Sequence, residues 1–181
     1  DTVDHNILLK KLFNLGIRGI ELQWFKNYLS DRKQFVYING SSSSLLSILL
    51  GVPQGSILGP LLFLIYIYDL PSSTFLNSFL FADDTTLLSS NSDIVTLTNF
   101  INNEFQKVVE FFRLHKLALH PEKTKFILFS HNRDVLANPP NIVINFNDAG
   151  APFSNTFLPV IPMTCVNNLP EPSIRFLGVY F

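Results

Sequence analysis

The spacing of apolar residues predicts several helices. Between positions 92 and 114, apolar residues recur every three or four positions and form one stripe along a helix. Ser92 and Asp93 are both suited to cap the start of this helix. Shorter helices are expected over 6–15, between Asp4 as N-cap and Gly16 as stop, over 20–29, and in the apolar segment that begins at Pro60.

Strand-like runs surround two turns. The runs 34–38 and 45–50 flank Asn39-Gly40, a hairpin signal that four serines lengthen. The runs 75–82 and 86–88 flank Asp83-Asp84 and predict a second hairpin with an acidic tip. Further strands are expected over 124–130 and 175–181, and the Pro/Asn-rich segment 131–173 reads as mostly loop with one strand at 142–146.

Helices and strands in this mixed order predict an α+β fold, with an antiparallel sheet and helices packed on one face. The chain has 181 residues, enough for one domain with a core or for the greater part of a larger one.

Composition excludes several classes of protein. Apolar residues make up 47% of the chain, yet the longest apolar run, 61–68, falls far short of the about 20 residues that span a bilayer. Cys165 is alone, which excludes an internal disulfide and suits an intracellular, reducing compartment. The four histidines lack zinc-type spacing, and the net charge of −1 argues against a strongly basic nucleic-acid clamp. The first residue is Asp rather than Met, so a truncated start is expected.

The adjacent carboxylates of Asp83 and Asp84 have two explanations. Aspartate is a common turn residue, and a solvent-exposed turn accounts for both side chains. Alternatively, oxygen ligands of this kind suit Mg²⁺, which commonly takes one or two carboxylates together with substrate phosphates. The apolar neighbours would embed the hairpin in the core and hold its tip rigidly, as a metal site requires.

A glycine- and proline-rich loop, 51–60, precedes the apolar helix. Its glycines recur every fourth residue, a pattern that permits close approach of another molecule to the backbone. The loop leads into a helix N-terminus, which favours phosphate, although it lacks the Gly-Lys-Ser/Thr of a Walker loop. An ordinary strand-to-helix connection explains the same residues, so both interpretations stay open.

Sequence blocks in a specific order resemble the reverse transcriptases of jockey-like non-LTR retrotransposons. The separations between the blocks make the joint pattern specific, whereas FADD alone would be weak. The blocks are GVPQGSILGPLLF at 51–63, similar to motif B, FADD at 81–84, similar to motif C, LALHPEKTKFILF at 117–129, similar to motif D, RFLGV at 175–179, similar to motif E, and the opening DTVDHNILLKKL, similar to the residues after the first catalytic aspartate of motif A.

The resemblance implies a right-hand polymerase palm, with fingers and thumb largely missing, and a loop-rich insertion at about 131–173. It implies two-metal nucleotidyl transfer from a deoxynucleotide to a primer 3′-hydroxyl, with two Mg²⁺ ions as cofactor. Asp83 and Asp84 would be metal ligands, Lys123 a proton donor or charge stabiliser near the triphosphate, and Gln54 and Gly55 contacts of the incoming nucleotide. Lys123 has a simpler explanation as a solvated lysine at a strand end. Residues 175–179 would help to hold the primer terminus.

One departure bears on activity. The family's motif A reads Asp-x-x-x-Ala-Phe-Asp, and Asp1 aligns with its second aspartate, so the first is not among these residues. Asp1 would lie up to roughly 20 Å from that carboxylate along an extended strand, too far to replace it. The 181-residue polypeptide alone is therefore expected to be inactive.

Three functions remain open: a reverse-transcriptase fragment, a catalytically dead nucleic-acid-binding or scaffold protein derived from such an element, and an RNA-dependent RNA polymerase. The Pro53-Gln54-Gly55-Ser56 run favours reverse transcriptases over the last class. The resemblance implies an RNA template, a DNA primer, deoxynucleotides and the rest of an element polyprotein as partners, no membrane, and a nuclear location during retrotransposition.

Overall fold

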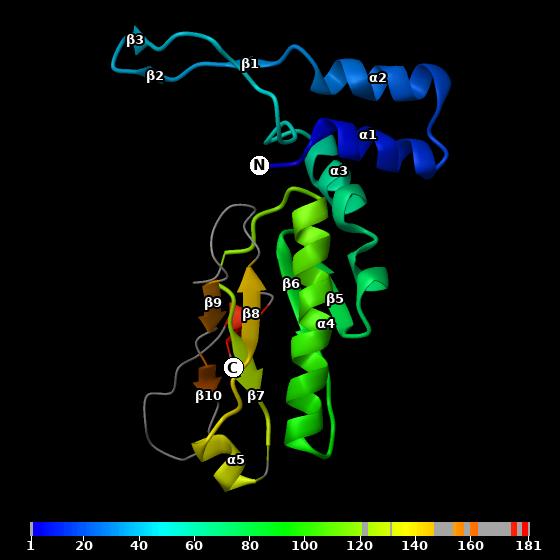
Figure 1. Ribbon diagram of the computed structural model, residues 1–181. Coiled ribbons are helices and arrows are strands. Elements are labelled where there is room, and N and C mark those ends of the chain that lie inside the picture. Colours follow the sequence, from blue (N-terminus) through cyan, green and yellow to red (C-terminus); the bar gives the residue numbers. More distant parts are fainter. Residues whose placement is uncertain are drawn as a thin grey trace. The chain divides into compact units, whose positions relative to one another are not determined.

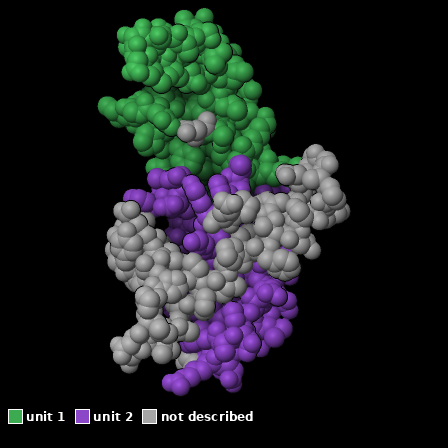
Figure 2. Space-filling view, turned by 90° about the vertical axis from the view of Figure 1, so that its left-hand side faces the viewer, with its two compact units in different colours: residues 1–70, 112–117 green, residues 71–111, 118–181 purple. Residues whose placement is uncertain are grey.

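The computed structural model describes residues 2–120, 123–130, 132–146, 154–157, 160–162, 175–176 and 179–180, with side chains up to Val143. The chain forms two compact units, which Figure 2 shows in separate colours. The first comprises Asp1–Leu70 and Phe112–Leu117, and the second comprises Pro71–Phe111 and Ala118–Phe181.

Three helices form the core of the first unit. Helix α1 (His5–Asn14) packs against both α2 (Gly19–Leu29) and α3 (Leu58–Ile67). The predicted caps of α1 are confirmed, because the Asp4 side chain accepts from the N–H groups of Asn6 and Ile7 and Gly16 follows the helix end at a φ of 97°. The fully buried side chains of this core include Val3, Leu8, Leu12, Leu62 and Tyr66.

The predicted hairpin around Asn39 and Gly40 is confirmed, with a tighter turn than expected. Both residues have a positive φ, 48° and 83°, as a two-residue type I′ turn requires. The serines after the turn do not lengthen it, because β3 (Ser41–Ser42) pairs at once with β2 (Tyr37–Ile38). Further along the hairpin, β1 (Lys33–Gln34) pairs with β4 (Leu46–Ser47). Figure 1 shows this hairpin extending from the helices, and all four short strands are exposed.

Helix α4 (Ile94–Leu114) contributes to the hydrophobic core of the second unit. It begins where the sequence predicts. Asp93 caps it, since its carboxylate accepts from Thr96 N at 2.7 Å. The apolar stripe packs on Leu87 of the hairpin formed by β5 (Asn77–Phe81) and β6 (Asp84–Leu88), which follows a short 3₁₀ helix, η1 (Leu70–Ser73). Figure 1 shows α4 running alongside the hairpin. The expected packing of helices on one face of an antiparallel sheet is therefore met in part, by one helix on one two-stranded hairpin.

The segment after α4 contains more regular structure than the sequence predicts. The expected strand at 142–146 is β8 (Val143–Phe146), which pairs with β9 (Ser154–Phe157). The expectation of loop elsewhere in 131–173 is wrong at β9, at β10 (Val160–Pro162) and at the helix α5 (Arg133–Ala137). The sequence did not indicate α5, because the helix is only five residues long and lies in a proline-rich segment. The Asn132 side chain caps it.

The strands do not form the single antiparallel sheet that was expected. In the described part of the chain they form six two-stranded sheets, of which one, β7 (Phe126–Leu128) with β10, is parallel. Strands of two to five residues offer few backbone groups for a third neighbour, which explains the small sheets. Within the described residues, no helix is both long and apolar enough to cross a bilayer.

Candidate functional site

The acidic tip of the second hairpin is a two-residue turn. Phe81 pairs with Asp84, so Ala82 and Asp83 occupy the turn itself. Ala82 has a φ of 50°, a left-handed conformation that costs an L-residue roughly 1–2 kcal/mol. The carboxylates of Asp83 and Asp84 are both exposed, and neither has a hydrogen bond or ion pair within the described residues.

The hairpin is embedded in the core on one face only. Cross-strand partners share a face of the pair, so Asp84 lies on the same face as Phe81 and Phe79. These two rings are 62% and 54% exposed, so the expectation that the apolar neighbours embed the hairpin in the core is wrong for this face. The opposite face is half-buried, and its Leu87 packs against the core residues Phe105 and Ile142. The tip is thus supported from one side and open on the other.

The donor set at the tip fits Mg²⁺. Two neighbouring carboxylates without a competing cation offer hard oxygen ligands and leave the remaining positions to water or phosphate. Among the described residues no group of three His, Cys, Asp or Glu side chains gathers around one point, so a complete protein cage is not formed there.

The glycine-proline loop is fixed at its start by the segment before α1. Gly51 N donates to Val3 O at 2.8 Å, and Asp4 forms a β-bridge with Leu50. The ring of His5 lies against the loop as well, with Nε2 2.7 Å from Gly51 O. Gly51 is buried and has a φ of 85°, a conformation that favours glycine.

The far end of the loop is closed around Ser56. Its hydroxyl donates to Pro53 O at 2.6 Å and accepts from Gly59 N, in the first turn of α3, at 3.0 Å. A Cβ on Gly59 would lie 2.8 Å from Pro53 O, so only glycine fits. The close approach at Gly59 is therefore made by the loop itself and not by another molecule.

Gln54 and Gly55 lie at the exposed apex between these two fixed ends. Gly55 has a φ of 77°, and a Cβ there would meet nothing within 4 Å. Its conformation, rather than crowding, therefore requires glycine. The candidate residues are divided between the units, with Gln54 and Gly55 in the first and Asp83, Asp84 and Lys123 in the second.

Lys123 occupies an exposed turn ahead of β7. Its backbone N–H donates to His120 O at 3.2 Å, and its ammonium has no partner among the described residues. The predicted strand over 124–130 is shorter in the structure, at Phe126–Leu128. These contacts favour neither interpretation of the lysine over the other, so both stay predictions.

The last motif forms a hairpin rather than the single strand expected over 175–181. β11 (Arg175–Phe176) pairs antiparallel with β12 (Val179–Tyr180). The described residues of this motif thus form two short paired strands in place of one. Asp1, on which the motif A alignment depends, lies outside the described residues.

A polar cluster in the first unit was not predicted from the sequence. Lys116 donates to Asp4 Oδ2 at 2.7 Å, and this bond is the main reason that the pKa of Asp4 lies below its ordinary value. Lys11 donates to Tyr66 O at 2.6 Å and pairs with Asp69, while burial lowers the pKa of its ammonium. Tyr66 in turn donates to His115 O at 2.5 Å. The sequence separation of these partners explains why no local pattern revealed them.

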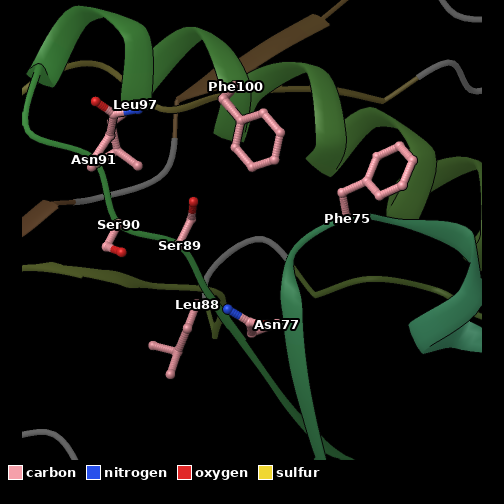
Figure 3. A pocket seen from close by; sticks show the side chains of 8 residues that line it. All are labelled: Phe75, Asn77, Leu88, Ser89, Ser90, Asn91, Leu97 and Phe100. Atoms are coloured by element: carbon pink, nitrogen blue, oxygen red, sulfur yellow. The ribbon is translucent and has the colours of Figure 1, made fainter.

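An open depression of about 320 Å³ lies at the other end of the β5–β6 hairpin, where β5 begins and β6 ends (Figure 3). Its lining contains no charged side chain. Four residues of β-strand separate it from the acidic turn by roughly 13 Å, so it is distinct from the candidate metal ligands. It is lined by Phe75, Asn77, Leu88, Ser89, Ser90, Asn91, Leu97 and Phe100.

Comparison with known proteins gives a consistent result. A family model described as reverse transcriptase (RNA-dependent DNA polymerase) matches residues 1–181. The "RNA-directed DNA polymerase from mobile element jockey" of Drosophila melanogaster is 27% identical over 114 residues, which cover 59% of this chain and 12% of that protein. The corresponding jockey protein of Drosophila funebris is 28% identical over 153 residues, or 80% of this chain and 16% of that protein.

A third relative, "Probable RNA-directed DNA polymerase from transposon BS" of Drosophila melanogaster, is 38% identical over 101 residues, or 54% of this chain and 10% of that protein. The chain thus spans between 10% and 16% of the length of these three relatives.

Proposed function

Because this chain belongs to the reverse transcriptase (RNA-dependent DNA polymerase) family, we propose that it supplies the palm of an RNA-directed DNA polymerase encoded by a non-LTR retrotransposon. The polymerase names of its relatives support the reaction and the type of element. The proposed reaction joins a deoxynucleotide to the 3′-hydroxyl of a primer, with RNA as template.

The observation that carries the proposal is the presentation of Asp83 and Asp84. They stand exposed at the tip of a hairpin whose other face is packed on α4, so the backbone that bears them is supported while their oxygens are accessible. We propose that both carboxylates bind Mg²⁺, which when bound would neutralise phosphate charge and favour ionisation of the primer hydroxyl. The protein residues contribute positioning and electrostatic stabilisation rather than covalent chemistry.

The remaining roles follow the order of the motifs. Gln54 and Gly55, at the apex of a loop fixed at both ends, would contact the incoming nucleotide and its template partner. The exposed Lys123 would approach the triphosphate as a proton donor or charge stabiliser. The hairpin of β11 and β12 would help to hold the primer terminus.

The proposed partners are an RNA template, a DNA primer, deoxynucleotides and the rest of an element polyprotein. With a net charge of −1, these residues lack the positive excess of a nucleic-acid clamp, so we place most of the phosphate contacts in other parts of the polymerase. Retrotransposition would take place in the nucleus.

We propose further that the 181-residue polypeptide is inactive by itself. Asp83 and Asp84 are two carboxylates, whereas the motif that the opening residues resemble contributes a third from a position that is not among these residues. In an assay with an RNA template, a primer, Mg²⁺ and deoxynucleotides, the isolated chain should give no extension, and robust incorporation would contradict this part of the proposal.

A chimera tests the activity. These 181 residues replace the corresponding segment of the jockey polymerase, and primer extension is measured on an RNA template with either deoxynucleotides or ribonucleotides. We expect Mg²⁺-dependent incorporation of deoxynucleotides that Asp83→Asn and Asp84→Asn each abolish, since either change removes a charged ligand. A chimera that has the circular dichroism of the parent enzyme but does not extend the primer would contradict the proposal and favour a catalytically dead binding protein.

A further inference from the structure

The side chain of His5 makes a directed contact with the glycine-proline loop. His5 is the first residue of α1, its ring is half-buried, and its Nε2 lies 2.7 Å from the carbonyl oxygen of Gly51. A carbonyl oxygen only accepts hydrogen bonds, so Nε2 must carry the proton and donate it. The contact joins residues that are 46 positions apart and therefore fixes the loop relative to α1.

Three consecutive residues hold the start of the loop together. Val3 accepts from Gly51 N at 2.8 Å, Asp4 forms a β-bridge with Leu50, and His5 donates to Gly51 O. Both polar groups of the Gly51 backbone are therefore used. Gly51 is buried in this arrangement, and its carbonyl takes its hydrogen bond from the imidazole.

The support from which His5 acts is itself rigid. Leu8 and Leu12 of α1 are fully buried. Asp4 caps the helix through bonds of 2.9 Å and 3.1 Å to the N–H groups of Asn6 and Ile7, and Lys116 holds its second carboxylate oxygen. The imidazole thus stands on a fixed helix end.

We propose that His5 is a positioning residue that holds the Gln54–Gly55 apex in the conformation that receives the incoming deoxynucleotide. This inference rests on the proposed function. His5 acts through Gly51 on one side of the apex, while Ser56 and Gly59 close the loop on the other side. The apex is exposed, and contacts on both sides of it fix its two ends. Loss of the imidazole donor would leave only the bond from Gly51 N to Val3 O and the bridge of Asp4 with Leu50 at this end of the loop. The apex would then sample other conformations more often, so that nucleotide binding would have to restore the order.

The test compares substitutions of His5 that differ in whether a side-chain N–H group can reach the carbonyl oxygen of Gly51. His5→Gln places an amide N–H close to the position of the imidazole Nε2, whereas His5→Asn is one methylene shorter and His5→Phe keeps a ring without a donor. Asn6→Ala, at the neighbouring exposed position of α1, is the matched control. Hydrogen exchange of the backbone over 51–59 and binding of dTTP with Mg²⁺ are measured on the 181-residue chain, with circular dichroism as the check on folding.

We expect His5→Asn and His5→Phe to raise the exchange rate over 51–59 about tenfold and to weaken dTTP binding by a similar factor, the size of one lost hydrogen bond. His5→Gln and Asn6→Ala should stay near the wild type in both measurements. The thermal midpoint of His5→Asn and His5→Phe should fall by no more than the few degrees that one lost hydrogen bond accounts for. This separates a positioning role from a general loss of stability.

Unchanged hydrogen exchange over 51–59 in folded His5→Asn and His5→Phe would show that His5 does not hold the loop. Faster exchange with unchanged dTTP affinity would overturn the positioning role while leaving the proposed function intact. If the wild-type chain binds no dTTP, the role of His5 in nucleotide binding fails. The exchange data of the same variants still test whether His5 holds the loop, and the chimera tests the proposed function separately.

Discussion

Glu104 on α4 accepts a hydrogen bond from the backbone N–H of Phe75 at 2.8 Å, two residues before β5 begins. The same carboxylate accepts from Thr74 Oγ1 at 3.1 Å and from the ammonium of Lys107 at 2.6 Å, and the residue is only 5% exposed. Glu104 therefore ties the base of the hairpin that bears Asp83 and Asp84 to the helix that supports it.

Glu104→Ala should lower the free energy of unfolding by about 2 kcal/mol or more, because it leaves Phe75 N and Thr74 Oγ1 without their acceptor. Glu104→Gln retains an acceptor oxygen and should cost roughly half as much. Urea denaturation measures both. Asn103→Ala, exposed on the same helix, is the control and should change stability by less than about 0.5 kcal/mol. Equal stability of Glu104→Ala and the wild type would show that the hydrogen bonds of Glu104 contribute nothing to the free energy of unfolding.

The stability contributed by Glu104 should depend on pH. The Lys107 ammonium, and then the Phe75 N–H, hold the pKa of Glu104 below its ordinary value of 4.5. A carboxyl whose pKa is lower in the folded state stabilises the fold above the unfolded-state pKa, and this contribution is lost as the pH falls through the folded-state pKa. Unfolding free energies measured from about pH 7 downward should therefore converge for the wild type and Glu104→Gln below pH 4.5. A constant difference in unfolding free energy between the two proteins throughout this pH range would contradict the lowered pKa of Glu104.

Asp4 combines a helix cap with an ion pair, and two substitutions separate these roles. Asp4→Ala removes both and should cost about 1–2 kcal/mol of stability. Asp4→Asn keeps a good cap but loses the charge that Lys116 contacts, and because that lysine is largely exposed it should cost less than about 1 kcal/mol. Thermal unfolding of both variants measures the difference. An Asn variant as unstable as the Ala variant would show that the ion pair, rather than the cap, dominates.

Two glycines of the 51–60 loop should respond differently to substitution. Gly59→Ala brings a Cβ to 2.8 Å from Pro53 O, a backbone atom that must shift, so a cost of about 1–3 kcal/mol is expected. Gly55→Ala meets no atom within 4 Å and suffers only from its positive φ, which costs roughly 1 kcal/mol. Gly55→Asn should be milder still, since asparagine tolerates this conformation. Chemical denaturation of the three variants would contradict the account if Gly55→Ala proved the most damaging.

Much of the fold follows from local sequence. The helix caps at Asp4 and Asp93, the turn at Asn39-Gly40 and the stripe of α4 depend on neighbours within a few residues, and the structure has all of them. The acidic tip was predicted as a hairpin for the same reason, and Phe81 pairs with Asp84 around it.

The features that could not be predicted from the sequence depend on pairing between residues far apart in the chain. The parallel contact of β7 with β10 and the bond from His5 to Gly51 join distant positions, and no local pattern encodes such partners. Glu104 offered a weak signal, since it is a carboxylate between Ile101, Phe105 and Val108 on the apolar side of α4. Its partners, Thr74 and Phe75, could not be identified before the fold was known.

The most direct test of the account is deoxynucleotide binding to the 181-residue chain with and without Mg²⁺, measured by titration calorimetry. We expect binding of dTTP to require Mg²⁺, to be lost when Asp83 and Asp84 are both changed to Asn, and to be weakened by Gln54→Ala. Binding of equal strength without Mg²⁺, or in the double Asn variant, would contradict the claim that these carboxylates hold the metal against a nucleoside triphosphate.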